Sequence, residues 1–353
     1  MDKKEDQVSI IIPIYNEEDK IIRNIESVLN SDYENMQIIL VNDNSSDDTM
    51  KILNRYISEE ERIILINNEK NMGASFSRNK ALDKATGKYV IFLDADDWIE
   101  PDFVSTLVQN ANKDNLDIVQ INYIKEEKDQ SIPQKHFKVK KEIYSEKEDI
   151  LENIKAVISN NKVEDSYFSH IRSISGKIFK RSLIEKKEKI RFKEDLVLSE
   201  NIFFNLEYML RAKKIKYMQK YLIHFTKDKS SISNSYIEEE QIKKEVKKSI
   251  KYMKESIKDI KTTYKLDKKE KAELDEYLSL FIFERIFLVY KHSINLKSDL
   301  EEKDKKRELI KYIEKENYMK YIKNINKNKL TDIEKKFLKY IKSSMFLKRF
   351  RII

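Results

Sequence analysis

An apolar stretch at residues 89–93 is followed at once by three aspartates, Asp94, Asp96 and Asp97. The stretch is rich in β-branched and aromatic residues, which predicts a strand that is buried on both faces. Ligands of open α/β sheets bind at the carboxyl ends of the strands, and carboxylates this close repel one another unless a cation relieves them. Mg²⁺ or Mn²⁺, hard ions that prefer oxygen ligands, would suit this group. The alternative is a polar turn whose acids cap a helix beginning near Pro101.

The segments before these aspartates alternate between strand and helix patterns. Apolar runs predict strands at residues 8–16, 37–41 and 62–66. Apolar residues at helical spacing predict helices at residues 21–29, 50–57 and 74–85. This alternation predicts a mostly parallel sheet with right-handed crossover helices. The polar turns that follow the strands should then converge on one edge of the sheet, at residues 15–19, 42–49 and 94–97.

The chain has 353 residues, which is long enough for a large core and suggests two domains or one domain with an extension. It carries 70 basic and 62 acidic residues, a net charge of +8, so most of the charge is mixed. The basic excess alone would fit a nucleic-acid-binding protein, but no nucleic-acid-binding motif accompanies it, and we expect no nucleic acid partner. The absence of cysteine excludes disulfides, thiolate zinc sites and cysteine nucleophiles.

Nothing in the sequence predicts a membrane-spanning segment. The N-terminus is charged and leads into the first strand without the apolar region of a signal peptide. The longest nearly apolar run, residues 278–290, includes Glu284 and Arg285 and is shorter than the roughly 20 residues that a spanning helix needs. We therefore expect a cytoplasmic protein with no transmembrane helix.

Four short motifs follow one another in this part of the chain: Ile11-Ile-Pro-Ile-Tyr-Asn-Glu17, Val41-Asn-Asp-Asn-Ser-Ser-Asp47, Asn71-Met-Gly-Ala-Ser-Phe-Ser-Arg-Asn79 and Phe92-Leu-Asp-Ala-Asp-Asp97. In this order they resemble the signatures of family 2 glycosyltransferases. The resemblance covers residues 6–110 strongly and continues more loosely to about residue 235. It implies a GT-A fold, which is a Rossmann-like α/β fold with a mostly parallel sheet flanked by helices. It also implies a nucleotide-sugar donor and an inverting mechanism.

The motifs would bind the nucleotide-sugar donor, as the resemblance implies. Tyr15 offers a flat face on which a uracil base can stack, and Asp43 can accept the imide N–H of that base. The alternative for Tyr15 is ordinary core packing. Gly73 permits close approach of the backbone, and Arg78 can pair with a diphosphate. The same site includes four neighbouring motif residues: Pro13, Asn16, Glu17 and Ala95.

The acidic pair of the fourth motif would hold a divalent metal, Mn²⁺ or Mg²⁺, by the same resemblance. Asp96 is the expected direct ligand, and Asp94 would contact the metal and the sugar or ribose. His224 lies where relatives close the donor site, and it could touch the diphosphate or the metal. The alternative is a strand histidine packed at the edge of the sheet. A metal held here would neutralise charge that develops on the departing nucleoside diphosphate.

A carboxylate must deprotonate the acceptor hydroxyl, and the family commonly supplies it from a Gly-Glu-Asp sequence before a helix. The corresponding residues here are Ser199, Glu200 and Asn201. An amide cannot act as a base, so Glu200 is the candidate base and Asp195 is the second candidate. Glu200 could instead act only on the dipole at the start of the helix.

The chain is predicted to form a GT-A domain at residues 1–235 and an all-α domain at residues 236–353. The first domain divides into a nucleotide-sugar half and an acceptor half, at about residues 1–110 and 111–235. The second begins where Lys/Glu-rich helical patterns begin. Its last helix, residues 333–353, has six basic residues from Lys336 onward and an apolar side. This helix would lie on the anionic inner surface of the membrane or pack against residues 278–290.

These features predict an inverting glycosyltransferase of the type that builds bacterial cell-surface polysaccharides. The enzyme would move a sugar from a nucleotide donor, expected to be a UDP-sugar, to a hydroxyl of a glycan or lipid-linked acceptor. The rival hypothesis is a nucleotide-sugar-binding protein of the same fold that has lost its catalytic base at Asn201.

Overall fold

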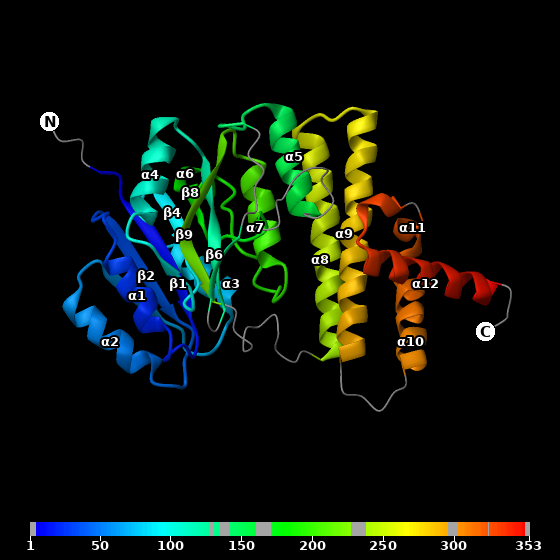
Figure 1. Ribbon diagram of the computed structural model, residues 1–353, viewed down its shortest axis with the longest axis horizontal. Coiled ribbons are helices and arrows are strands. Elements are labelled where there is room, and N and C mark those ends of the chain that lie inside the picture. Colours follow the sequence, from blue (N-terminus) through cyan, green and yellow to red (C-terminus); the bar gives the residue numbers. More distant parts are fainter. Residues whose placement is uncertain are drawn as a thin grey trace. The chain divides into compact units, whose positions relative to one another are not determined.

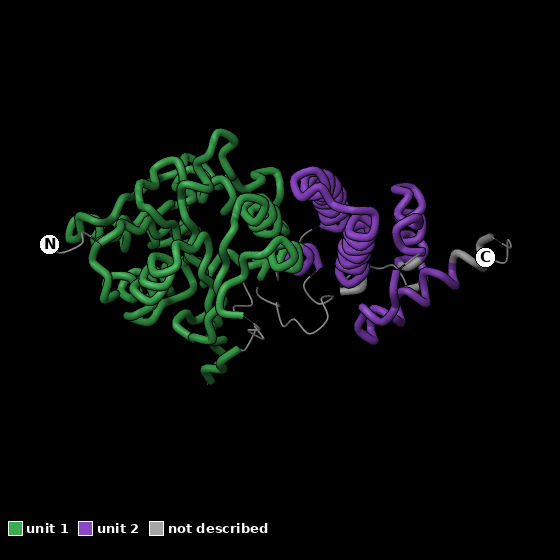
Figure 2. Tube along the Cα trace, turned by 90° about the horizontal axis from the view of Figure 1, so that it is seen from above, with its two compact units in different colours: residues 1–154, 165–234 green, residues 155–164, 235–353 purple. Residues whose placement is uncertain are grey.

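A computed structural model of the protein describes residues 5–127, 130–134, 141–159, 171–226, 238–295, 302–323 and 325–349. The chain forms two compact units, which are coloured separately in Figure 2. The first comprises residues 1–154 and 165–234, and the second comprises residues 155–164 and 235–353. The sequence analysis placed a single boundary at residue 235, whereas the second unit also includes a short segment from the middle of the chain.

Among the described residues, the first unit is built on one nine-stranded sheet (Figure 1). Its strands are β1 (Val8–Ile14), β2 (Met36–Asn42), β3 (Ile63–Asn67), β4 (Tyr89–Phe92), β5 (Trp98–Ile99), β6 (Ile118–Glu127), β7 (Gln130–Gln134), β8 (Lys177–Lys180) and β9 (Ile215–Thr226). Their order across the sheet is β3-β2-β1-β4-β8-β6-β9-β5, and β7 pairs with β6. Strands β1 to β4 are the four strands that the sequence predicted before residue 100.

The two halves of the sheet differ in strand direction. Strands β3, β2, β1 and β4 are parallel. In the other half only β6 and β9 pair in parallel, and the pairs β4–β8, β6–β8, β6–β7 and β5–β9 are antiparallel. The predicted parallel arrangement therefore describes the first half, and the second half is mixed. One reason is connection length, because only two residues separate β6 from β7, and such a short connection joins antiparallel strands.

Helices cover both faces of this sheet. Helices α1 (Ile21–Leu29), α2 (Thr49–Glu59) and α4 (Phe103–Lys113) pack on one face, over a core that includes Ile10 and Ile38. Helices α3 (Ala74–Leu82) and α7 (Glu200–Met209) pack on the other face. There the ring centroids of Phe92 of β4 and Phe204 of α7 are 5.3 Å apart. The remaining helices are α6 (Arg181–Ile184), which belongs to this unit, and α5 (Lys147–Ile158), of which residues 155–158 are assigned to the second unit. The helices that the sequence predicted after β1, β2 and β3 are therefore confirmed.

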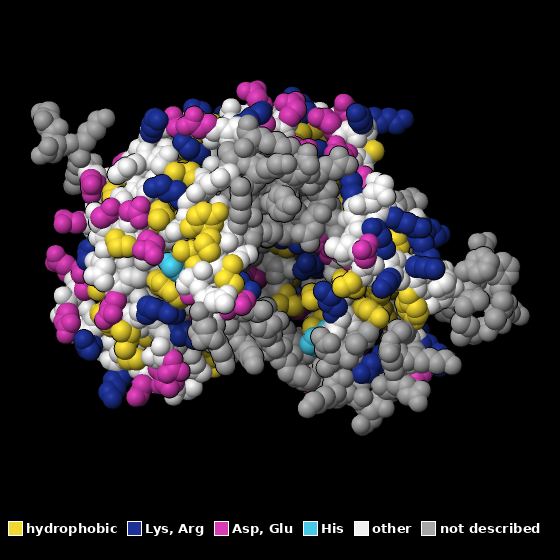
Figure 3. All heavy atoms as spheres, viewed as in Figure 1, with side chains coloured by type: hydrophobic (Ala, Val, Ile, Leu, Met, Phe, Trp, Pro, Cys, Tyr) yellow, Lys and Arg dark blue, Asp and Glu magenta, His cyan; other side chains and the backbone are white. Residues whose placement is uncertain are grey.

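The second unit is helical in its described residues. Its elements are α8 (Glu239–Thr263), α9 (Lys268–Asn295), α10 (Glu302–Lys315), α11 (Met319–Ile322), the 3-10 helix η2 (Lys327–Lys329) and α12 (Asp332–Arg349). An apolar stripe on α8 is buried at Val246, Ile250, Met253, Ile257 and Ile260, which recur at intervals of three or four residues. Basic side chains are frequent on the face of this unit drawn in Figure 3, whereas the face of the first unit mixes both signs. None of the described helices is long and apolar enough to cross a membrane.

Helix α12 packs part of its apolar side inside the helical unit. Phe337 and Ile341 are buried. The ring of Phe337 stacks on Tyr290 of α9, with centroids 4.5 Å apart, and its centroid is 5.1 Å from that of Phe287. These contacts agree with the packing alternative for the last helix. The side chains of residues 345–349 and the whole of residues 350–353 lie outside the described part of the chain.

Gly87 sets the start of β4 against β1. Its N–H donates to Ser9 Oγ at 2.9 Å. A Cβ atom at residue 87 would lie 2.6 Å from the backbone nitrogen of Ser9 and 2.8 Å from the carbonyl oxygen of Gln7. Both are backbone atoms next to a paired strand, so neither can move aside alone. Because the acidic turn at residues 94–97 follows β4, this close approach also fixes the position of that turn.

Replacing Gly87 by alanine should therefore destabilise the protein. We expect Gly87→Ala to lower the free energy of unfolding by about 1–3 kcal/mol, the usual cost of overpacking. The matched control is Lys84→Ala, at a nearby exposed position, which should change stability by less than about 0.5 kcal/mol. Urea unfolding followed by circular dichroism measures both variants. A Gly87→Ala protein as stable as the parent would contradict the packing described here.

Candidate active site

The turns after β1 and β2 are tied together at the carboxyl edge of the sheet. The N–H of Asn16 donates to Ser45 Oγ at 3.0 Å, and the N–H of Ser46 donates to Asn16 Oδ1 at 2.8 Å. The N–H of Glu17 donates to Thr49 Oγ1 at 2.9 Å. Asn16 has a left-handed backbone (φ 53°), which asparagine tolerates better than most residues. Asn16 and Glu17 therefore shape the loops at the edge where the sequence predicted that the polar turns converge.

Tyr15 stands at the end of β1 with 46% of its surface exposed, whereas Ile14 before it is buried. The core-packing alternative for Tyr15 is therefore wrong, and its ring is accessible to a flat ligand. Pro13 lies within β1, in register with Val41 of β2. Ala95 is buried in the acidic turn. Pro13 and Ala95 thus belong to the framework of the site through their backbone positions.

Asp43 organises the turn that leads into α3. Its Oδ1 accepts from Asn68 Nδ2 at 2.7 Å and from the N–H of Met72 at 2.9 Å. Its Oδ2 accepts from the N–H of Gly73 at 2.7 Å. Gly73 caps α3 with φ 86°, a conformation that favours glycine. A carboxylate oxygen can accept more than one hydrogen bond, so Oδ2 retains capacity for a donor on a ligand.

A buried arginine joins the acidic turn to the start of α7. Arg78, which is 5% exposed, donates through Nη2 to Asp94 Oδ1 at 2.8 Å. Its Nη1 lies 3.6 Å from Glu200 Oε1. The other oxygen of Asp94 accepts from Ser175 Oγ at 3.4 Å. Nε and Nη1 of Arg78 are buried, and within the described residues neither has a hydrogen-bond partner. The sequence analysis missed Ser175 and the proximity of Arg78 to Glu200.

Glu200 begins α7 and has 16% of its side chain exposed. Burial raises the pKa of its carboxyl above the ordinary value, and the charge of Arg78 opposes that rise. A raised carboxyl pKa suits a base that works near neutral pH. Ser199, just before it, has φ 81°, which favours the glycine found at the corresponding position of the family sequence. Asp195 is exposed, so Glu200 is the better-placed candidate.

Asn201 is held by a second buried network. Its carbonyl oxygen accepts from Asn205 Nδ2 at 2.8 Å. The Oδ1 of Asn205 in turn accepts from the buried amine of Lys177, also at 2.8 Å. Burial lowers the pKa of Lys177 well below the ordinary value. Asn201 Oδ1 has no hydrogen-bond partner within the described residues. The amide at Asn201 therefore sits beside the candidate base without being able to take a proton itself.

The acidic turn is fastened by two polar residues that the sequence analysis missed. Asn24 of α1 is 1% exposed, and its Nδ2 donates to the carbonyl oxygens of Asp94 at 3.0 Å and Asp97 at 2.8 Å. Thr226, at the end of β9, donates through Oγ1 to the carbonyl oxygen of Asp96 at 2.7 Å. A signal for Asn24 was present, because it is a polar residue between the apolar core positions of an amphipathic helix.

The carboxylates of this turn are crowded. Burial, followed by the charge of Asp94, raises the pKa of Asp96 to about 6. The same two causes raise the pKa of the buried Asp97 well above its ordinary value. A cation at Asp94 and Asp96 would relieve this repulsion, and their oxygens suit Mg²⁺ or Mn²⁺. In the described part of the chain no three His, Asp or Glu side chains form a metal cluster. The remaining ligands would therefore be water and phosphate oxygens, as Mg²⁺ commonly has.

His224 is on the strand β9, and its side chain lies between two glutamates from other segments of the chain. Its Nδ1 is 2.7 Å from Glu126 Oε1, and its Nε2 is 2.8 Å from Glu100 Oε1. The ring also stacks on Trp98, with centroids 4.7 Å apart. Both ring nitrogens thus face carboxylate oxygens, an arrangement that matches the alternative of a packed strand histidine. The assignment of His224 to the metal stays a prediction. In this geometry both ring nitrogens already contact carboxylates, so neither is free to bind a metal ion.

Comparison with known proteins places the chain in a family. The model described as Glycosyl transferase family 2 matches residues 9–186, about half of the chain. The chain belongs to this family. It is 30% identical over 235 residues to Glycosyltransferase GlyA of Streptococcus pneumoniae serotype 4, a match that covers 66% of this chain and 32% of GlyA. A second relative is EpsH of Bacillus subtilis, which is 30% identical over 231 residues, or 65% of this chain and 63% of EpsH. The chain thus spans less than two thirds of the length of both relatives.

Two solved structures share the architecture. One is S. aureus TarS 1-349 in complex with UDP-GlcNAc, with a TM-score of 0.65 and 21% identity over 92% of this chain and 82% of that chain. The other is the mannosyltransferase PcManGT from Pyrobaculum calidifontis in complex with GDP-Man and Mn²⁺, with a TM-score of 0.52 and 13% identity over 98% of this chain and 87% of that chain. At these identities the likeness shows the fold alone, and the predicted GT-A type of α/β fold is confirmed.

The crowded acidic turn should make Asp96 a destabilising residue in the metal-free protein at neutral pH. The folded state holds the Asp96 proton more tightly than the unfolded chain, so stability is lost as the pH rises from 3.8 through about 6. We expect Asp96→Asn, which cannot ionise, to be more stable than the parent at pH 8 in EDTA by roughly 1–2 kcal/mol. The difference should be largely lost by about pH 4, where the parent Asp96 is protonated in the folded state and about half protonated in the unfolded chain.

Thermal unfolding of both proteins between pH 4 and pH 8 measures this effect. Asp19→Asn, which removes the same charge at an exposed position, is the control and should show no such pH-dependent gain. If Asp96→Asn were no more stable than the parent at pH 8, the charge of Asp96 would not destabilise the folded protein, which would contradict the repulsion described here.

Proposed function

We propose that this protein is an inverting glycosyltransferase that moves a sugar from a UDP-sugar to a hydroxyl of a glycan or lipid-linked acceptor. The observation that carries the proposal is the position of Arg78, which contacts both the donor-side acid Asp94 and the candidate base Glu200. Family membership supports sugar transfer, and the UDP-GlcNAc complex of TarS supports a UDP-sugar as donor. A growing bacterial cell-surface polysaccharide is the acceptor that the sequence resemblance favours.

The donor would lie across the carboxyl edge of β1, β2 and β4. The exposed ring of Tyr15 would stack on the uracil base, and Asp43 Oδ2 would accept its imide N–H. Arg78, which is held beside Asp94, would supply positive charge next to the diphosphate. Asn16 and Glu17 would act by holding the two loops together.

The transfer step would begin at the acceptor hydroxyl. Glu200 would take its proton while the oxygen attacks the anomeric carbon from the face opposite the diphosphate. The bond from that carbon to the diphosphate oxygen then breaks, and the nucleoside diphosphate leaves with the electron pair. Attack from the opposite face inverts the anomeric configuration. The positive charge of Arg78 would stabilise the negative charge that develops on the leaving group.

Asp96 and Asp94 are the residues that would hold a divalent cation, with Asp96 as the direct ligand. Bound Mn²⁺ or Mg²⁺ would supply further positive charge beside the leaving diphosphate. The raised pKa of Asp96, caused by burial and by the neighbouring Asp94, supports a cation at this position. The PcManGT complex with Mn²⁺ supports such an ion in this fold.

Donor turnover without an acceptor tests this function. We expect the parent to hydrolyse at least one UDP-sugar with Mn²⁺ or Mg²⁺ and to lose that activity in EDTA. Asp96→Asn keeps the size of the side chain but removes a full charge, so it should weaken Mn²⁺-dependent UDP-sugar binding by at least about 10-fold and abolish turnover. Calorimetry with Mn²⁺ measures binding, and Asp19→Asn is the control. Undiminished binding by Asp96→Asn would contradict the metal assignment.

A second experiment identifies the base. Glu200→Gln should lower turnover by at least about 100-fold with donor binding nearly unchanged, because loss of a general base commonly costs that much. Asp195→Asn is the matched comparison and should have a mild effect. Because burial raises the pKa of Glu200 above 4.5, the kcat/KM of the parent should fall on the acid side at a pH above 4.5, where Glu200 becomes protonated.

The results also separate the enzyme from the rival binding protein. An equal loss in Asp195→Asn with a mild effect in Glu200→Gln would move the role of base to Asp195. Tight UDP-sugar binding without turnover in the parent, together with activity gained by Asn201→Asp, would show that the protein binds the donor but has lost catalysis.

Attachment to an anionic membrane surface through residues 333–353 stays a prediction. Phe337 and Ile341 are buried in the helical unit, so the exposed Lys336 and Lys339 would make the contact. We expect weak pelleting with anionic vesicles at low salt, lost above about 0.3 M salt because such contacts are screened. A double variant, Lys336→Gln with Lys339→Gln, should pellet less. Equal pelleting of the parent and this variant would contradict attachment through α12.

A further inference from the structure

Helix α8 presents a row of lysines on its exposed side. Lys244, Lys247, Lys251 and Lys254 are all exposed. They follow one another at intervals of three or four residues, so one lysine occurs on each turn of the helix. The row from Lys244 to Lys254 is about 15 Å long at 1.5 Å per residue.

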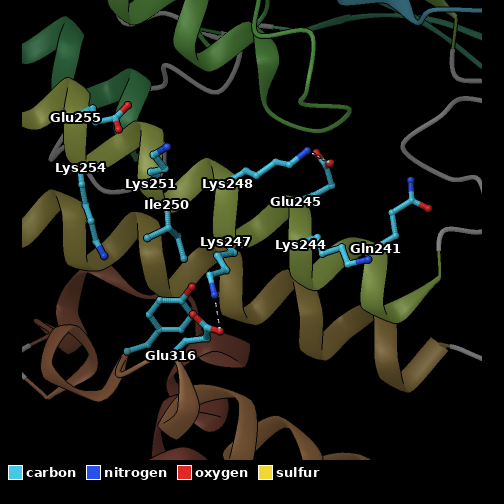
Figure 4. A pocket seen from close by; sticks show the side chains of 11 residues that line it. Gln241, Lys244, Glu245, Lys247, Lys248, Ile250, Lys251, Lys254, Glu255 and Glu316 are labelled. Carbon is cyan, nitrogen blue, oxygen red and sulfur yellow. Dashed lines mark hydrogen bonds and ion pairs between the residues drawn. The ribbon is translucent and has the colours of Figure 1, made fainter.

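These lysines line a groove within the helical unit. The groove has a volume of about 800 Å³, and Figure 4 shows its lining side chains. One wall is α8, and the other includes Glu316 and Tyr318, which follow α10. Ile250 and Tyr318 are buried residues that also line it. The groove is therefore a concave site with an apolar floor and a cationic rim.

The rim has more positive charge than its own acids neutralise. Five lysines and three glutamates line the groove. Lys247 Nζ is 3.0 Å from Glu316 Oε1, and Lys248 Nζ is 3.7 Å from Glu245 Oε1. In the described part of the chain Lys244, Lys251 and Lys254 form no ion pair. These three ammonium groups are spread along the groove without a carboxylate partner among the described residues, and that of Lys254 lies 5.2 Å from the ring centroid of Tyr321.

We propose that this groove binds a flexible polyanion whose phosphate groups repeat along its length. Lysine binds phosphate as a point charge, and one lysine per turn can meet successive phosphates of an extended chain. The proposal deepens the proposed function, on which it rests, because a phosphate-bearing glycan acceptor could be held here while its end is glycosylated. The groove is separate in the chain from every residue of the donor site.

Two other anionic partners fit these observations less well. A membrane surface would need exposed apolar residues that enter the lipid, whereas Ile250 is buried at the floor of a concave groove. A single-stranded nucleic acid would need a series of aromatic rings for its bases, whereas Tyr318 is the aromatic residue among those that line the groove. Both partners remain outcomes of the test.

Binding of inorganic polyphosphate to the full chain tests the proposal. The groove variant carries Lys244→Gln, Lys251→Gln and Lys254→Gln. The control variant carries Lys258→Gln, Lys268→Gln and Lys269→Gln, three exposed lysines that do not line the groove and that remove the same charge. We expect the groove variant to bind polyphosphate about 10-fold more weakly at 50 mM salt and the control variant to change by less than about 2-fold, because each exposed ionic contact contributes modestly. Circular dichroism confirms that both variants are folded.

Three results would overturn the proposal. The parent may fail to retain polyphosphate at low salt, or both triple variants may weaken its binding equally, which would indicate only the net charge. A groove variant that loses binding to anionic vesicles or to single-stranded RNA, but keeps polyphosphate binding, would assign the groove to those partners instead. UDP-sugar hydrolysis by the parent and both variants is measured separately. Its absence in all three would contradict the proposed function without affecting the polyphosphate result.

Discussion

The candidate active site depends on keeping three carboxylates close together in one turn against their mutual repulsion. Asp94, Asp96 and Asp97 follow the buried strand β4, and burial raises the pKa values of Asp96 and Asp97. The backbone of the turn is fixed by the amide of Asn24 and the hydroxyl of Thr226, while Arg78 supplies the compensating charge at Asp94. A turn left to itself would separate or neutralise these acids. The surrounding framework instead preserves a site that suits a cation.

The sheet order explains how this framework is assembled. Strand β4 lies between the parallel half, which carries the donor motifs, and β8, which begins the mixed half. Residues on both sides therefore reach the acidic turn: Asn24 and Arg78 from one side, Ser175 and Thr226 from the other. Because Gly87 allows β4 to lie close to β1, the position of the turn relative to β1 is also fixed. The parallel half and the mixed half of the sheet thus meet at one central strand.

The first half of the fold could be predicted from sequence because local patterns determine it. Tyr15, Asp43 and Asp94 stand directly after apolar strands, so their location at one edge followed from the order of the elements. Ser175 and Thr226 could not be found in this way, because their role is a contact with residues far away in the chain. The environment of His224 was also hidden, since its neighbours Glu100 and Glu126 come from separate segments.

The mixed half of the sheet was harder to predict for a similar reason. Strand β7 (Gln130–Gln134) is polar and mostly exposed, so it has no apolar run that marks a strand. The helical unit was easier, because the stripe on α8 repeats every three or four residues and its burial follows from that period. The period could not predict the groove on the lysine side of α8. The second wall of that groove is formed by residues that follow α10, which are distant in the chain.

Under the proposed function, the contact between Arg78 and Glu200 would give the site an order of events. Without a donor, the guanidinium charge opposes the burial that makes Glu200 more basic. The negative charge of a bound diphosphate would offset that guanidinium charge, and the glutamate would then hold a proton more readily. The base would be weakest in the idle enzyme and strongest after the donor has arrived. Ordered, donor-first turnover would then be a property of a single side chain, and a hydroxyl that entered too early would find no effective base.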